Sequence, residues 1–189
     1  MTSDAFKRSL RTHQEKGFFK NLQILRGIER ESLRVTQEGK ISQNSHPKNL
    51  GSPLTSEDIT TDFAEALVEL VTPTFESTEE LFAHLSLLHK FLYSEMEEEI
   101  LWNFSMPCAF HSEQEIKIAE YGKTNSGMLK HIYRKGLRLR YGSIMQCVSG
   151  IHFNFSLSED SWDTLTNSPD QSFINQKYLG AIRNIKRNF

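Results

Sequence analysis

Cysteine is scarce in this sequence, and long apolar runs are absent from it. Cys108 and Cys147 are the only cysteines, and no C-x-x-C spacing occurs, so neither a disulfide framework nor a zinc site is predicted. A Cys147–His152 nucleophile pair is disfavoured, because spacing in sequence does not identify a nucleophile's spatial partner. No apolar run approaches the roughly 20 residues that span a bilayer, and no basic-then-apolar leader opens the chain. We expect a cytoplasmic protein with free, buried thiols.

The common nucleotide and zinc signatures are missing as well. The sequence contains no Walker A motif, no G-x-G-x-x-G and no H-E-x-x-H. Its 189 residues are 38% hydrophobic and 24% charged, which is typical of one folded domain or a large piece of one. The formal net charge of -2 gives no general case for nucleic-acid binding. We therefore expect neither a nucleic-acid nor a membrane partner.

Acidic residues are absent from a long internal stretch between Tyr121 and Ser158. The same stretch holds six basic side chains: Lys123, Lys130, Arg134, Lys135, Arg138 and Arg140. Its first part reads as a small-residue loop leading into a short basic helix, which can approach an anion through backbone N–H groups and the helix dipole. The alternative is a basic surface helix docked on the acidic helix predicted at 76–99. Both interpretations stay open on the sequence.

The first motif that suggests a function is a predicted strand with two glutamates on one face. In "LRGIERESLRV", at 25–35, alternation places Glu29 and Glu31 on the face of Leu33 and Val35, and the arginines on the other, solvated face. Two carboxylates that point into an apolar layer need a cation nearby. Lys or Arg from elsewhere in the fold would make this a structural ion-pair cluster, whereas a divalent cation such as Mg²⁺ would make it a metal site.

A second acidic segment and a helix follow along the chain. "TTDFAEALVELVTPTF", at 60–75, is interpreted as a strand because of the proline near its end, with Glu65 and Glu69 on one face. Residues 76–99 form the clearest helix, with Ser77 as its predicted N-cap. The acidic run that ends this helix is interpreted as a solvated face.

The acid-free stretch ends in a strand with a polar face. In "QCVSGIHFNFSLS", apolar residues alternate with His152, Asn154 and Ser156, which indicates a half-buried strand. This strand and the two acid-bearing ones can lie side by side in one antiparallel sheet, where their polar faces would form one cavity. Six side chains would line it: Glu29, Glu31, Asp62, Glu69, His152 and Asn154.

Five ordered motifs resemble the N-terminal part of one enzyme family: "GIERESLRV", "LGSPLTSEDITTDFAEALVELVTP", "NFSMPC", "IAEYGKTNSGMLKHIYRKGLRLRYG" and "MQCVSGIHFNFSL". From about residue 20 to residue 158, the sequence is similar to glutamate–cysteine ligase of the proteobacterial type, also called γ-glutamylcysteine synthetase. The family uses ATP to join the γ-carboxylate of L-glutamate to the amino group of L-cysteine, the first step of glutathione biosynthesis. The resemblance implies an α+β fold like that of glutamine synthetase and other carboxylate–amine ligases, with a largely antiparallel, curved sheet and flanking helices. Residues 1–189 would be the N-terminal part of a single catalytic domain, so the fold would be incomplete.

The resemblance also implies roles for individual residues. The implied metal ligands are Glu29, Glu31, Asp62, Glu69 and His152. The implied catalytic residues are Glu29, Arg134 and His152, with Arg134 on a mobile loop near the phosphates. The implied substrate-binding residues are Phe63, Tyr133 and Leu137 for cysteine, and Gln146 and Asn154 for glutamate. Mg²⁺, replaceable by Mn²⁺, is the implied cofactor, and ATP is the co-substrate.

The chemistry of amide formation agrees with these roles. A carboxylate oxygen must become a leaving group, so ATP would first convert glutamate to γ-glutamyl phosphate, with Mg²⁺ reducing the repulsion between the anions. The cysteine amine would then attack the acyl phosphate in a cavity closed to water. This scheme requires no protein nucleophile, and the sequence signals none.

Members of this family are much longer than 189 residues. The resemblance therefore implies a missing C-terminal segment with further substrate-binding residues and at least one more metal-binding carboxylate. One alternative is an inactive or partner-dependent remnant that binds only metal or nucleotide. Another is a related carboxylate–amine ligase with a different amine acceptor. Because an incomplete sheet exposes apolar surface and unpaired edges, the isolated chain is predicted to be poorly soluble or only partly ordered.

Overall fold

A computed structural model describes residues 3–15, 17–20, 22–165 and 169–188 of the chain. The chain divides into two compact units, Met1–Leu25 with Phe155–Phe189, and Arg26–Asn154. We call Arg26–Asn154 the sheet unit, because it holds most of the strands. Among the described residues, no helix combines the length and the apolar character needed to cross a membrane. That all 189 residues belong to a single catalytic domain stays a prediction.

The described residues form both helices and strands. The strands are β1 (Ile24–Val35), β2 (Ile59–Thr61), β3 (Leu67–Val71), β4 (Ile100–Trp102) and β5 (Ile151–Leu157). The α-helices are α1 (Ser3–Glu15), α2 (Thr78–Glu95), α3 (Asn125–Tyr141), α4 (Glu159–Leu165) and α5 (Gln171–Asn188). Short 3-10 helices are η1 (Phe18–Lys20), η2 (Lys48–Leu50), η3 (Glu113–Glu115) and η4 (Met145–Cys147).

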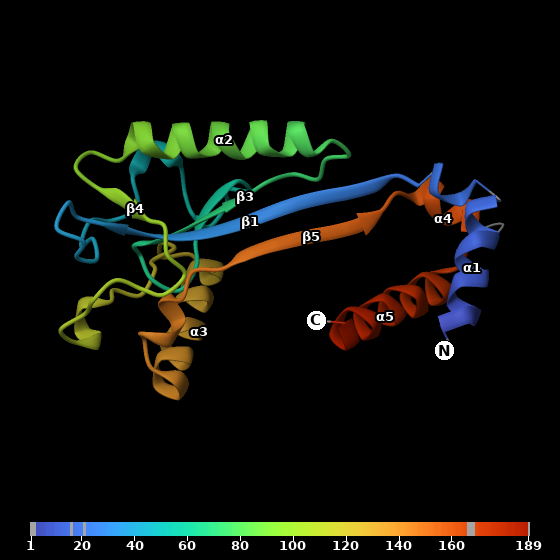
Figure 1. The fold of residues 1–189 in the computed structure, drawn as a ribbon. Helices are drawn as coiled ribbons and strands as arrows, with labels where there is room; N and C mark the ends of the chain where they lie inside the picture. The colour runs from blue at the N-terminus through green and yellow to red at the C-terminus, as the bar shows by residue number, and fades with distance from the viewer. Residues whose placement is uncertain (1–2, 16, 21, 166–168, 189) are drawn as a thin grey trace. The chain divides into compact units, whose positions relative to one another are not determined.

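The long strand β1 is the centre of an antiparallel sheet. The strand order is β2-β3-β1-β4, and β5 also pairs with β1. Residues 29–33 of β1 pair with β3, and residues 33–35 pair with β4, both in antiparallel register. Figure 1 shows β5 alongside β1 and running in the opposite direction. The predicted α+β class, with a largely antiparallel sheet and flanking helices, is confirmed.

Helices α2 and α3 lie on opposite faces of this sheet (Figure 1). Alternation along β3 sends Val68 and Leu70 to an apolar cluster that includes Leu88 and Leu92 of α2. Leu67 belongs to a second cluster, on which α3 packs. The alternative in which the basic helix docks on the acidic one is therefore wrong, because the sheet separates them. Ser77 caps α2 as predicted, since its hydroxyl accepts the N–H of Glu80.

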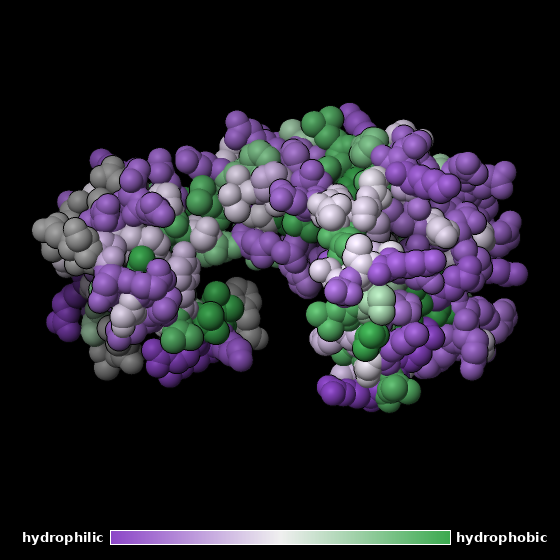
Figure 2. Space-filling model, turned by 180° about the vertical axis from the view of Figure 1, so that it is seen from behind, coloured by the Kyte–Doolittle hydropathy of each residue, from purple (hydrophilic) through white to green (hydrophobic). Residues whose placement is uncertain are grey.

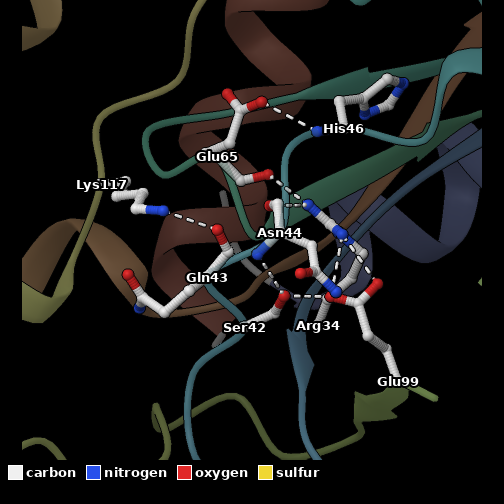
Figure 3. Close-up of polar contacts among 8 residues, drawn as sticks. All are labelled: Arg34, Ser42, Gln43, Asn44, His46, Glu65, Glu99 and Lys117. Atoms are coloured by element: carbon white, nitrogen blue, oxygen red, sulfur yellow. Dashed lines mark hydrogen bonds and ion pairs between the residues drawn. The ribbon is translucent and has the colours of Figure 1, made fainter.

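Arg34 is buried, with only 1% of its surface exposed, although the alternation of β1 placed it on the solvated face. Its Nη1 lies 2.8 Å from a carboxylate oxygen of Glu99, and its Nη2 donates to the carbonyl oxygens of Glu65 (3.0 Å) and Asn44 (3.1 Å). The hydroxyl of Ser42 donates to the same Glu99 carboxylate (Figure 3). The acidic run after α2 is thus not entirely a solvated face, because Glu99 compensates a buried charge.

Glu65 belongs to the turn between β2 and β3 and not to a strand. Its carboxylate accepts the backbone N–H groups of His46 (2.9 Å) and Glu120 (2.8 Å). Figure 3 shows how this carboxylate, the Arg34 guanidinium and the loop around Asn44 meet in one polar network. The network joins segments that are distant in sequence and fixes the turn that precedes β3.

The strand β5 is exposed and not half-buried as predicted. Ile151 is 68% exposed and Phe153 is 60% exposed, so the rest of the sheet unit leaves both side chains uncovered. Apolar side chains also reach the surface over α2 and α3 (Figure 2). These exposed groups agree with the expectation that an incomplete sheet leaves apolar surface uncovered, although poor solubility itself stays a prediction.

Candidate active site

Two glutamates from neighbouring strands face each other at the centre of the candidate site. Glu31 of β1 is the direct cross-strand partner of Glu69 of β3, on the face of the sheet where α3 packs. One carboxylate oxygen of Glu31 accepts the backbone N–H of Gly150 (2.8 Å). Burial raises the pKa of Glu31, and the charges of Asp62 and Glu29 raise it further. Burial, followed by the charges of Asp62, Glu31 and Glu29, raises the pKa of Glu69 to about 7.

No Lys or Arg of the described residues neutralises these carboxylates. Among the described residues, neither Lys nor Arg forms an ion pair with Glu29, Glu31 or Glu69; the one ion pair of this group joins Glu29 to His152. The interpretation as a structural cluster neutralised by Lys or Arg therefore loses its support. The pair can lose its charge by protonation of Glu69, whose pKa is about 7, or by binding a cation from outside the described residues.

Glu29 connects β1 to the polar face of β5. Its two carboxylate oxygens contact Asn154 Nδ2 (2.8 Å) and His152 Nδ1 (3.1 Å). The hydrogen bond from Asn154 lowers the pKa of Glu29. The hydrogen bond to Glu29 raises the pKa of His152, whose side chain is 57% exposed. The structure thus brings together the strands that the sequence predicted to be neighbours.

Asp62 and Arg134 meet at the edge of this cluster. Asp62 follows β2, and its Oδ1 lies 3.9 Å from Nη2 of Arg134. Arg134 also donates from Nε to the carbonyl oxygen of Asp62 (2.5 Å). The expectation that Arg134 lies on a mobile loop is wrong, because it lies in the middle of α3, where Thr124 caps the N-terminus.

The donor chemistry of the cluster fits a hard divalent cation. Carboxylate oxygens are the ligands that Mg²⁺ prefers, and the unneutralised Glu31–Glu69 pair favours a bound cation. However, the described part of the chain contains no group of three His, Cys, Asp or Glu side chains arranged to hold one metal ion. The residues therefore have the ligand atoms that suit Mg²⁺. For three of them to bind one ion, their side chains would have to move closer together.

The residues predicted to bind substrate are only partly gathered. Phe63 lies in the apolar core, and the half-buried Leu137 packs against that same core. Tyr133 is exposed on α3, one turn before Leu137. Gln146 lies in the short helix η4 and is half-buried, whereas Asn154 contacts Glu29 directly. A binding role for these five residues stays a prediction.

Sequence patterns missed two groups that support the site. The backbone N–H of Gly150 holds Glu31, and a backbone donor leaves no signature in side-chain periodicity. The buried Tyr121 donates its hydroxyl to the carbonyl oxygens of Thr61 (2.7 Å) and Asp62 (2.9 Å). The only signal in the sequence was that Tyr121 opens the stretch without acidic residues.

Comparison with known proteins identifies the family to which the chain is similar. The family model described as glutamate–cysteine ligase matches residues 8–189. The chain is 49% identical over 170 residues to the glutamate–cysteine ligase of Pseudomonas putida strain W619, covering 87% of this chain and 32% of that relative. The ligase of Bordetella petrii is 48% identical over 167 residues with the same coverage. The chain thus spans about a third of the length of the curated relatives that it matches.

Two solved structures share the fold. The glutamate–cysteine ligase of Francisella tularensis, in complex with AMP, superposes with a TM-score of 0.74 at 44% identity, covering 76% of this chain and 29% of that one. A bifunctional glutathione synthetase from Pasteurella multocida superposes with a TM-score of 0.73 at 33% identity, covering 85% of this chain and 21% of that one. The carboxylate–amine ligase fold expected from the sequence is confirmed. The chain belongs to the glutamate–cysteine ligase family.

Proposed function

We propose that this chain forms the N-terminal part of an ATP-dependent ligase site, which joins the γ-carboxylate of L-glutamate to the amino group of L-cysteine. One observation carries the proposal: Glu31 faces Glu69 with no Lys or Arg of the described residues paired to either, beside the Glu29–His152–Asn154 group. Such a surface suits a cation and the phosphates that accompany it. The AMP bound to the Francisella tularensis relative supports the use of a nucleotide.

The proposed reaction passes through γ-glutamyl phosphate. Mg²⁺, or Mn²⁺ in its place, would be held by Glu29, Glu31, Asp62, Glu69 and His152, and when bound it would offset the negative charge of the phosphates. Arg134 would place its positive charge beside the transferred phosphoryl group. His152, whose Nδ1 contacts Glu29, would turn its other ring nitrogen to this cluster, where it would bind the cation when unprotonated or donate to a phosphate oxygen when protonated.

The substrates would be held by the remaining predicted residues. Asn154 and Gln146 are hydrogen-bonding side chains suited to the polar ends of glutamate. Phe63, Tyr133 and Leu137 would form the cysteine pocket, where an apolar wall can contact the thiol side chain. Phe63 lies in the core, whereas Tyr133 lies on an exposed face of α3. The pocket would therefore need a further wall from another segment.

A longer polypeptide would supply that wall. The chain spans about a third of the length of its relatives, and exposed apolar side chains alternate with His152 and Asn154 along β5. The same two observations favour a second candidate function, a partner-dependent remnant that binds metal or nucleotide but does not complete the reaction. A cytoplasmic location stays a prediction that accompanies the proposed use of ATP.

Phosphate release from ATP tests the proposal. The chain would be assayed with Mg²⁺, glutamate and cysteine, alone and with a separately produced segment of the Pseudomonas putida relative that follows the matched region. We expect release that depends on both amino acids only in the mixture, and its loss in a chain carrying Glu29→Gln and Glu69→Gln. Binding of ATP without release in the mixture would support the remnant. Release that persists in the double variant would contradict the site assignment.

A further inference from the structure

Tyr121 connects the turn after β2 to helix α3. Its buried phenol donates to the carbonyl oxygens of Thr61 (2.7 Å) and Asp62 (2.9 Å). The guanidinium of Arg134 lies 4.6 Å from the centroid of its ring, and the ammonium of Lys130 lies 5.0 Å from it. Burial raises the pKa of Tyr121, so the hydroxyl keeps its proton and remains a donor. One side chain thus contacts both a proposed metal ligand and a proposed phosphate-binding residue.

The contacts of Arg134 converge on the same point. Its Nε and the Tyr121 hydroxyl both donate to the carbonyl oxygen of Asp62. Its Nη1 donates to the carbonyl oxygen of Lys130 (3.1 Å), and its side chain is 13% exposed. A planar guanidinium can stack on an aromatic ring and donate in its own plane at the same time, which an ammonium cannot do. The ring and the carbonyl together leave Arg134 one orientation.

The segment that carries Tyr121 is itself fixed. Ala119 donates its backbone N–H to the carbonyl oxygen of Phe63 (3.0 Å), and the N–H of Glu120 binds the carboxylate of Glu65 (2.8 Å). On the other side, Gly127 brings α3 so close that a Cβ there would overlap the carbonyl group of Tyr121. Tyr121 is therefore held between the turn and the helix as a rigid surface for Arg134.

We propose that Tyr121 is the positioning residue for Arg134: its ring and hydroxyl hold the guanidinium beside Asp62 at the edge of the acidic cluster. The ring sets the plane of the guanidinium, and the hydroxyl fixes the carbonyl to which Arg134 donates. The consequence for ATP rests on the proposed function, in which Arg134 contacts the phosphates. The contact between Tyr121 and Arg134 does not rest on it.

The first test measures the contact directly in the 189-residue chain by NMR. The Nε–H signal of Arg134, assigned by its disappearance in Arg134→Lys, should differ from that of a free arginine, because the Asp62 carbonyl shifts it downfield and the Tyr121 ring shifts it upfield. Tyr121→Phe keeps the ring and should keep that difference, whereas Tyr121→Leu should move the signal to the position of a free arginine. An unchanged signal in a folded Tyr121→Leu chain would overturn the proposal.

The second test asks whether Tyr121 acts through Arg134. Binding of MgATP would be measured for the wild type, Tyr121→Leu, Arg134→Ala and the double variant. We expect Tyr121→Leu to weaken binding about fivefold, Tyr121→Phe to weaken it less than about twofold, and Tyr121→Leu to have no further effect in the Arg134→Ala background. An equal loss in both backgrounds would show a merely structural role and overturn the proposal. If the wild-type chain binds no MgATP, either alone or mixed with the segment of the Pseudomonas putida relative, the proposed function fails and the NMR result alone decides the role of Tyr121.

Discussion

Glu31 and Glu69 stand directly opposite each other across the antiparallel pair of β1 and β3. Like charges in such a position destabilise a sheet by up to about 1 kcal/mol, and more when they are partly buried. Burial, followed by the charges of Asp62, Glu31 and Glu29, raises the pKa of Glu69 to about 7, so the repulsion from Glu31 adds to the cost of burial. The pair therefore lowers the stability of the fold whenever both carboxylates are ionised and no cation is bound.

The free energy of unfolding should fall as the pH rises through the pKa of Glu69. Because the folded-state pKa is about 7 and the ordinary value is 4.5, this contribution is complete below about pH 4.5 and is lost above about pH 7. After allowance for solvent screening we expect a loss on the order of 1–2 kcal/mol, most of it absent in Glu69→Gln. Urea unfolding of both proteins at several pH values measures it. Parallel pH profiles would contradict the assignment.

The pKa of His152 should depend on Glu29. The hydrogen bond to Glu29 is the largest cause of the raised pKa of His152, so Glu29→Gln should bring this pKa down toward the ordinary value. Titration of the His152 ring signals by NMR measures the change. His111, which is exposed and distant in sequence, serves as the internal control. A His152 pKa that does not move would show that the Glu29–His152 contact is absent in solution.

Two glycines of α3 should respond in opposite directions to replacement by alanine. A Cβ at Gly127 would overlap the carbonyl group of Tyr121, so Gly127→Ala should destabilise the chain by about 1–3 kcal/mol. A Cβ at Gly136 meets nothing within 4 Å, so Gly136→Ala should stabilise it by about 0.5–1 kcal/mol. Urea unfolding of both variants checks the pair. Equal effects of the two substitutions would contradict the close contact between α3 and Tyr121.

The buried ion pair of Arg34 and Glu99 should be far more costly to break than to replace. Arg34→Met leaves the Glu99 carboxylate without its partner, so we expect a loss of about 3–5 kcal/mol in the free energy of unfolding. Arg34→Met combined with Glu99→Leu should recover much of that loss. Lys40→Met, at an exposed position, is the control and should change little. Full additivity of the two substitutions would show that the pair does not act as a unit.

The sequence predicted the positions of helices and strands better than the burial of their side chains. Alternation located β1 and β5, and a serine cap located α2, because these signals are local. Alternation failed at Arg34, since β1 is covered on both faces near its end and side-chain period cannot show which face is wet. Alternation also predicted one continuous strand through Glu65, where the structure has the β2–β3 turn. This turn contains neither glycine nor proline to mark it in the sequence.

Long-range contacts account for the rest of the difference. Tyr121 meets carbonyl groups some 60 positions earlier, and no local pattern marks such a partner. The exposure of Phe153 could not be predicted from alternation either, because burial depends on what other polypeptide covers the strand. Of the candidate site, the sequence located the acidic strands and the His152–Asn154 strand, whereas the resemblance alone supplied the individual roles.

Binding of a divalent cation to the isolated chain tests directly whether the Glu31–Glu69 cluster is a metal site. Mn²⁺ would be titrated into the folded wild-type chain near pH 8 and followed by electron paramagnetic resonance, beside a Glu31→Gln, Glu69→Gln variant. A matched control would carry Glu38→Gln and Glu79→Gln, since Glu38 and Glu79 are exposed and lie outside the cluster. The predicted result is a site that the control keeps and the cluster variant loses. Equal binding by the wild type and the cluster variant, or no binding by the folded wild type, would contradict it.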